Sequence, residues 1–69
     1  MVEVFKTNIR ENSMAKQLAT KLLVHFPHCK INFDLQDCDK ILRVEGKLIR
    51  SEKIIEVIHT SGYECQVLE

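Results

Sequence analysis

Apolar residues follow two different periods along the first third of the chain. Residues 1–7 (MVEVFKT) mix β-branched and aromatic residues with polar ones, a pattern that predicts a strand. After a polar loop, apolar residues recur at steps of three and four, which predicts an amphipathic helix. We expect Asn12 or Ser13 to cap this helix, and Pro27 to end it, because the residue before a proline is disfavoured in the helical region. The apolar stripe consists of Ala15, Leu18, Ala19, Leu22, Leu23 and Phe26.

The middle of the chain changes to a period of two. Residues 29–35 (CKINFDL) alternate between apolar and polar side chains, which predicts a strand with one buried face and one face in water. Residues 36–39 (QDCD) form a turn rich in Asp, and residues 40–45 (KILRVE) form the next strand. Because the connection is short, these two strands are expected to pair as an antiparallel hairpin.

The last third predicts one more helix and one more strand. Ser51 is expected to cap a helix after the connection 46–50, and Gly62 to end it in a left-handed conformation. Residues 63–68 (YECQVL) form the final strand. The order βαββαβ predicts an α+β, ferredoxin-like sandwich: a four-stranded antiparallel sheet in the order 4-1-3-2, both helices on one face and the other face open. The expected core contains Leu18, Leu22, Ile31, Phe33, Ile54 and Ile58.

Length and charge limit the classes of function. A chain of 69 residues is enough for one domain, spanning residues 1–69, and it is too small to bury a large active-site cleft beside a core. This favours a binding module over an enzyme. Ten basic and ten acidic residues give no net charge, so we expect neither a nucleic-acid partner nor attachment to an anionic membrane. No apolar stretch has the length of a signal peptide or a membrane span, which predicts a cytoplasmic location.

The three cysteines do not form a recognisable framework. Cys29, Cys38 and Cys65 are odd in number, and no two of them have CxxC spacing. Free thiols in a reducing compartment are therefore expected rather than disulfide bonds.

Three segments together resemble one known family. They are residues 5–9 (FKTNI), residues 39–46 (DKILRVEG) and residues 61–68 (SGYECQVL). In order and spacing they are similar to the heavy-metal-associated domains of copper chaperones and copper-transporting ATPases, and the first resembles small bacterial members in particular. The resemblance covers nearly the whole chain. It implies the ferredoxin-like fold and a soft-metal site for an ion such as Cu(I), held by two thiolates of a CxxC pair in the loop before the first helix and in its first turn.

The chain departs from the family at that metal loop. Residues 9–15 (IRENSMA) stand where the resemblance places the CxxC pair. Counting from the start of the loop puts Glu11 and Met14 in the two ligand positions, and counting back from the end of the helix puts Asn12 and Ala15 there. Neither alignment supplies a cysteine. Glu11 is a hard oxygen ligand that suits a soft ion poorly, and Met14 is either a thioether ligand or a residue that packs on the core.

Two functions remain open. The first is a non-enzymatic binding domain that is degenerate at the metal loop and contacts a protein partner or a second copy of itself, in an accessory role in metal handling. The second is a carrier of a soft metal ion with a rebuilt site of Met14, Cys38, His59 and Cys65, which the topology places toward one end of the sheet. Against the second, the two thiols belong to strands or turns near opposite edges, whereas both sulfurs must reach a shared ion within about 2.3 Å.

A further cluster lies at the opposite end of the expected sheet. His25, His28 and Cys29 surround Pro27. They are either ligands of an opportunistic zinc or nickel site or surface residues at a helix end, where a cationic histidine suits the negative end of the helix. We expect the second.

Overall fold

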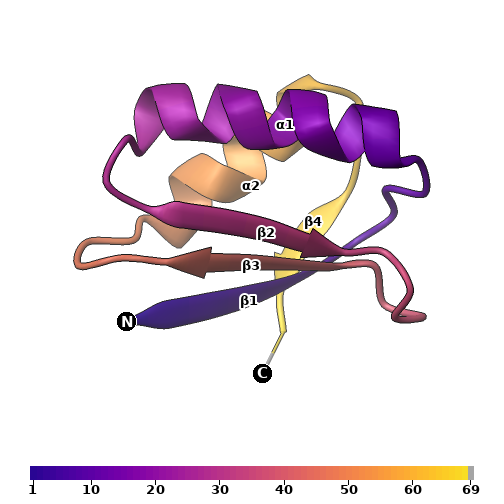
Figure 1. The fold of residues 1–69 in the computed structure, drawn as a ribbon, viewed down its shortest axis with the longest axis horizontal. Helices are drawn as coiled ribbons and strands as arrows, with labels where there is room; N and C mark the ends of the chain where they lie inside the picture. Colours follow the sequence, from indigo (N-terminus) through magenta and orange to yellow (C-terminus); the bar gives the residue numbers. More distant parts are fainter. Residues whose placement is uncertain (69) are drawn as a thin grey trace.

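A computed structural model describes residues 1–68 as two helices against one side of a four-stranded sheet (Figure 1). In chain order the elements are β1 (Val2–Thr7), α1 (Asn12–His25), β2 (Lys30–Asp34), β3 (Ile41–Glu45), α2 (Ser51–Thr60) and β4 (Cys65–Val67). The predicted ferredoxin-like βαββαβ order is confirmed. Within the described residues, neither helix combines the length and the hydropathy needed to cross a membrane.

The sheet has the order β2-β3-β1-β4, as predicted, and all neighbouring strands are antiparallel. The central strands β1 and β3 pair Phe5 with Leu42, and β3 pairs Val44 with Ile31 of β2. Because successive residues of a strand point to opposite faces, these apolar residues share the face that the helices cover. The other face carries polar residues of β2 and β3 such as Asn32 and Arg43, and both are exposed.

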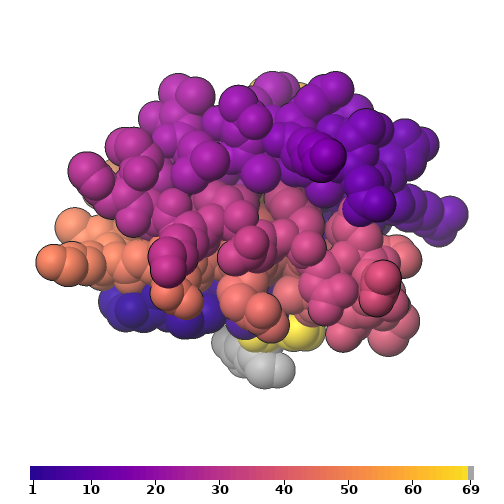
Figure 2. Space-filling model, in the orientation of Figure 1, coloured from indigo at the N-terminus to yellow at the C-terminus, as the bar shows by residue number. Residues whose placement is uncertain are grey.

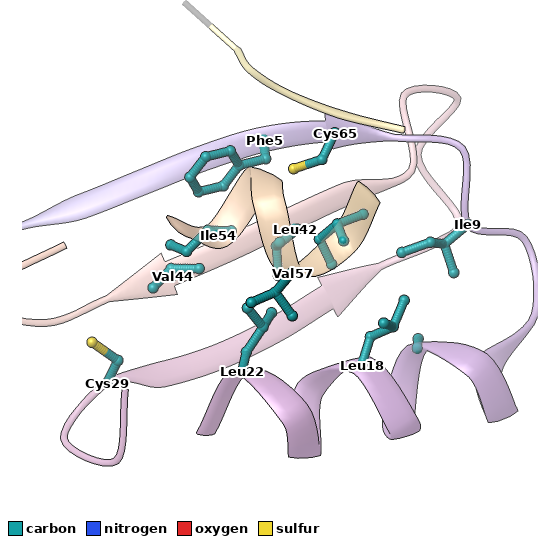
Figure 3. Close-up of a cluster of buried hydrophobic side chains, with 12 residues drawn as sticks. Phe5, Ile9, Leu18, Leu22, Cys29, Leu42, Val44, Ile54, Val57 and Cys65 are labelled. Atoms are coloured by element: carbon teal, nitrogen blue, oxygen red, sulfur yellow. The ribbon is translucent and has the colours of Figure 1, made fainter. Parts of the chain in front are cut away.

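The core lies between the helices and the inner face of the sheet (Figure 3). The predicted core residues of both helices are fully buried, but Ile31 and Phe33 are only half-buried against the core. The physical reason is that β2 is an edge strand, so it has a neighbouring strand on one side only. The largest fully buried side chains are Phe5, Ile9, Leu18, Leu22, Leu42, Val44, Ile54 and Ile58.

Both helix caps lie one residue earlier than predicted. The N-cap of α1 is Glu11 rather than Asn12 or Ser13, and the N-cap of α2 is Arg50 rather than Ser51. Both cap residues have an extended backbone, and neither forms a side-chain hydrogen bond to its helix. The predictions were wrong because Asn12, Ser13 and Ser51 already lie in the first turns of their helices, and the Ser51 hydroxyl donates to Glu3 Oε1 on β1 (3.5 Å).

All four strands are shorter than the predicted ranges 1–7, 29–35, 40–45 and 63–68, while the left-handed glycine is confirmed. Gly62 has φ +93°, which closes α2 as expected. The following Tyr63 donates its N–H to the Ile58 carbonyl (3.2 Å), so it still belongs to the helix exit, and β4 begins only at Cys65. At the other end, Cys29 donates its N–H to the Phe26 carbonyl (3.1 Å) and therefore belongs to the turn before β2.

Candidate functional site

Three connections meet at the end of the sheet where β1 enters α1. Ile9, in the loop between β1 and α1, is fully buried, and its N–H donates to Thr7 Oγ1 (3.3 Å). The same Thr7 hydroxyl donates to the Lys40 carbonyl, just before β3 (2.6 Å). Asn8 Oδ1 accepts the N–H of Glu64 from the connection between α2 and β4 (2.9 Å). The hairpin turn and the start of β4 thus lie at the same end as the loop, as the topology predicted.

The loop itself presents a carboxylate and a half-buried thioether. Glu11 is exposed at the N-cap of α1, and Met14, three residues later, packs partly against the core. The other alignment, Asn12 with Ala15, does not present two side chains to solvent, because Ala15 is only 6% exposed. A carboxylate is a hard ligand, whereas Cu(I) prefers polarisable sulfur. The residues present in the loop therefore do not fit a soft-metal site.

Cys65 is buried at the start of β4 and faces the core. Figure 3 draws its sulfur on the core side of the sheet, in the neighbourhood of Phe5. Burial removes water from the thiol and raises its pKa from 9.0 to about 12. Near neutral pH the thiol is protonated, whereas a metal ion is bound by the thiolate.

Cys38 is exposed in the turn between β2 and β3, on the far side of β1 from Cys65. Thr7 lies between them: it pairs with Cys65 across β1 and β4, and on its other side its N–H donates to the Asp39 carbonyl (3.1 Å). Segments on either side of one strand are roughly 10 Å apart. Two thiolates that share an ion lie no more than about 4.6 Å apart. The structure does not bring these two thiols together.

His59 is the one predicted ligand that lies near Cys65. It is exposed at the end of α2, and the two residues line one shallow hollow of about 430 Å³ together with residues of β1 such as Lys6. Neither Met14 nor Cys38 lines this hollow. Of the four predicted ligands, the structure therefore groups only His59 with Cys65.

One group of candidate ligands was not predicted. Within residues 1–68, the only three His, Cys, Asp or Glu residues whose ligand atoms lie within 4.8 Å of one another are Asp37, Cys38 and Asp39. Both carboxylates already have partners: Asp37 Oδ1 accepts the Asp39 N–H within the turn (2.9 Å), and Asp39 forms an ion pair with Lys6 of β1 (3.8 Å). In the sequence, only the pattern Asp37-x-Asp39 could have indicated this group, and the turn that these residues form is sufficient to explain the pattern.

The cluster at the opposite end lines a hollow without forming a ligand set. His25, His28 and Cys29 border an open groove of about 750 Å³. The ligand atoms of these three residues do not all lie within 4.8 Å of one another, and Cys29 turns its sulfur toward Gly46. The structure supplies no converging ligand atoms there.

Comparison with known proteins adds one close structural likeness. No family model matches this chain, and no curated protein matches its sequence. Among solved structures, the chain is similar to the solution structure of the yeast copper transporter domain Ccc2a, determined in the apo and Cu(I)-loaded states. The TM-score is 0.83 at 16% sequence identity, and the match covers 99% of this chain and 94% of that one. At this identity the likeness establishes the fold: the chain has the ferredoxin-like architecture of that copper transporter domain.

Proposed function

We propose that this chain is a small non-enzymatic binding domain with a heavy-metal-associated fold whose metal loop no longer holds a soft metal ion. It acts by contact with a protein, in an accessory role in metal handling. The single observation that carries this proposal is the chemistry of the loop between β1 and α1, where an exposed Glu11 and a half-buried Met14 stand in place of two thiols.

The state of the remaining thiols supports the same proposal. A cysteine binds a soft ion as the thiolate, and burial raises the pKa of Cys65 to about 12, so this thiol is protonated near neutral pH. Cys38 is accessible, but β1 separates it from Cys65. Any ion that reached both sulfurs would need a rearrangement of the sheet end, which the hydrogen bonds of Thr7 and Asn8 oppose.

The structural likeness supports the link to metal handling. The yeast domain is a copper transporter domain that has been seen loaded with Cu(I). A chain that keeps the same fold over nearly its full length, yet lacks the thiol pair, fits a protein that retains the fold of such a domain and does not bind its metal ion. Three free thiols are also consistent with a reducing, cytoplasmic location.

A soft-metal carrier is the second candidate. The observation in its favour is that His59 and Cys65 line one hollow. Met14 and Cys38 would have to move toward that hollow to complete the ligand set.

Competition for Cu(I) separates the two candidates. The reduced chain is mixed with Cu(I) and a chromogenic chelator that a CxxC domain would resist, near neutral pH. We expect the chelator to keep the ion, and the variant with both Cys38→Ser and Cys65→Ser to behave like the wild type; Cys29→Ser is the matched control. If the wild type holds one Cu(I) against the chelator and the double variant does not, the carrier replaces the proposed function.

A further inference from the structure

The edge strand β2 is open along its outer side. It is one end of the sheet, and its ladder with β3 continues through all five of its residues without a bulge or a proline. Natural sheets usually block such an edge with a bulge, a proline, charged side chains or a covering segment, because unpaired backbone groups are a template for another strand. The charged residues of β2, Lys30 and Asp34, have opposite signs. Figure 2 shows atoms of the β2 segment at the surface below α1. The other edge strand, β4, has only three residues.

The hydrogen-bond phase of the sheet shows which backbone groups of β2 are free. The N–H of Gly46 donates to the carbonyl of Met1 (3.0 Å), one step beyond the pair Val2–Glu45. Because hydrogen-bonded pairs alternate along an antiparallel ladder, the even-numbered residues of β3 bond to β1 and its odd-numbered residues bond to β2.

The pairing of β2 with β3 shows which residues of β2 bond to β3. Lys30, Asn32 and Asp34 lie opposite odd-numbered residues of β3, so their backbone groups face β3. Ile31 and Phe33 lie opposite even-numbered residues, so their N–H and C=O groups face away from the sheet.

The sequence of this edge is complementary to itself. We propose that β2 pairs antiparallel with β2 of a second copy of this chain, centred on Asn32, to give one continuous sheet across two molecules. In this register Ile31 lies opposite Phe33 of the second copy, and these are the two residues whose backbone groups are free. Lys30 lies opposite Asp34 of the second copy, and the two-fold axis repeats each pair. Opposite charges directly across a ladder stabilise it, and like charges destabilise it.

The groove beside the edge has room for the side chains of the added strand. Ala15 and Ala19 of α1, with Ile31 and Phe33, help to line a hollow of about 340 Å³ between α1 and β2. The two small alanines leave this space under the helix. In the proposed pairing, the apolar residues of the second copy lie on the helix side of the sheet, because Ile31 and Phe33 do so here. The half-burial of Ile31 and Phe33 is then completed across the interface.

An exposed leucine extends the same surface. Leu23 is 42% exposed, and it follows Ala19 by four residues, so both lie on one side of α1. When two copies pair through β2, their α1 helices become neighbours across the two-fold axis. Leu23 then lies between the two α1 helices instead of in water. A short extended peptide would have no helix to cover Leu23, so a second copy is the favoured occupant.

This inference rests on the proposed function and makes it more specific: the protein that the domain contacts is a second copy of this chain. The first test is sedimentation of the wild-type chain with a metal chelator present, from about 10 μM to about 1 mM, since pairing through one strand of five residues buries little surface and should be weak. We expect a monomer–dimer equilibrium. A monomer throughout overturns the inference and leaves the metal-free reading of the loop intact. The same run is repeated with Cu(I) in place of the chelator, and a dimer that forms only with Cu(I) overturns both the inference and the proposed function.

Charge substitutions test the register. Lys30→Asp and Asp34→Lys each place like charges opposite one another twice per dimer, so each should weaken the dimer by about tenfold or more. The double variant restores opposite charges and should recover most of the wild-type affinity. Lys47→Asp makes the same change of charge in the exposed connection between β3 and α2, and should leave the dimer unchanged. Single variants without effect, or a double variant no tighter than the singles, overturn the register.

Amide hydrogen exchange of the wild type tests the same pairing without any substitution, and so remains decisive if a charge variant fails to fold. The amides of Ile31 and Phe33 should become protected as the concentration rises, whereas those of Asn32 and Asp34 should be protected at every concentration. A dimer in which the Ile31 and Phe33 amides stay exposed uses another surface, and contradicts the proposal.

Discussion

Gly46 lies so close to Cys29 that there is no room for a side chain between them. A β carbon at position 46 would stand 2.6 Å from Cys29 Sγ, closer than real contacts allow. Cys29 is buried, so its sulfur cannot move freely into solvent. Gly46→Ala should therefore lower the free energy of unfolding by about 1–3 kcal/mol, as overpacking does elsewhere. Urea denaturation of the purified variant measures this change.

The control removes the sulfur. In Cys29→Ala the nearest side-chain atom to the added β carbon is Cys29 Cβ, at 3.4 Å, and that contact is tolerable. The double variant Gly46→Ala/Cys29→Ala should be more stable than the sum of the two single effects predicts, by about 1 kcal/mol. Additive effects would show that the sulfur is not the obstacle.

The Thr7 side chain joins the end of β1 to the segment before β3 and to the loop before α1. Its hydroxyl donates to the Lys40 carbonyl and accepts the Ile9 N–H, and the residue is buried. Thr7→Val keeps the shape but leaves both backbone groups without their partner, which should cost about 1–3 kcal/mol. Thr20→Val is the matched control, because the Thr20 hydroxyl bonds to a carbonyl on the exposed side of α1. Equal losses in the two variants would contradict the role given to Thr7.

The fold could be predicted because periodicity and short connections leave few topologies. The clean alternation of residues 29–35 and the turn after them gave the hairpin, and the stripe through Leu18 and Leu22 gave the buried face of α1. The caps could not be predicted as well. Whether Asn12 or its neighbour Glu11 occupies the cap depends on where the backbone leaves the extended region, and the side-chain types of residues 11–13 do not determine that point.

The candidate site was less predictable because it depends on distances between elements. The sequence placed Cys38 and Cys65 at one end of the sheet, which the structure confirms, but only the structure shows Thr7 between them. The half-burial of Phe33 was also missed, although the predicted strand order places β2 at an edge: alternation tells which face a residue occupies and not how much of that face its neighbours cover.

The Cys65 thiol should make stability depend on pH in the alkaline range. Its pKa is raised from 9.0 to about 12 by burial, so between these values the folded chain retains a proton that the unfolded chain releases. Since the folded state then binds more protons, its stability is fully present below about pH 9 and falls as the pH rises toward 12, by at most about 1.4 kcal/mol per pH unit.

Cys65→Ala isolates this effect from other alkaline titrations. We expect the difference in unfolding free energy between wild type and variant to shrink steadily from pH 8.5 to about 11. A constant difference over this range would mean that the folded-state thiol ionises as readily as an unfolded one. Thiol labelling at pH 8 gives a second readout: exposed Cys38 should react quickly, and buried Cys65 only after denaturation.

The last prediction concerns the restoration of a metal site in the loop. Glu11 at the N-cap and Met14 in the first turn are three residues apart and both reach the surface, so Glu11→Cys/Met14→Cys should place two thiols on one side of the helix start. The helix N-terminus favours thiolates there, and we expect this variant to hold one Cu(I) against a chelator that strips the wild type. Asn12→Cys/Ala15→Cys adds two cysteines at the same spacing but directs one thiol into the core, because Ala15 is buried, and it should bind far more weakly. If the two variants bind equally well, the burial of Ala15 does not prevent metal binding, and the prediction is wrong. If neither binds, the loop has lost the geometry of a metal site as well as its ligands.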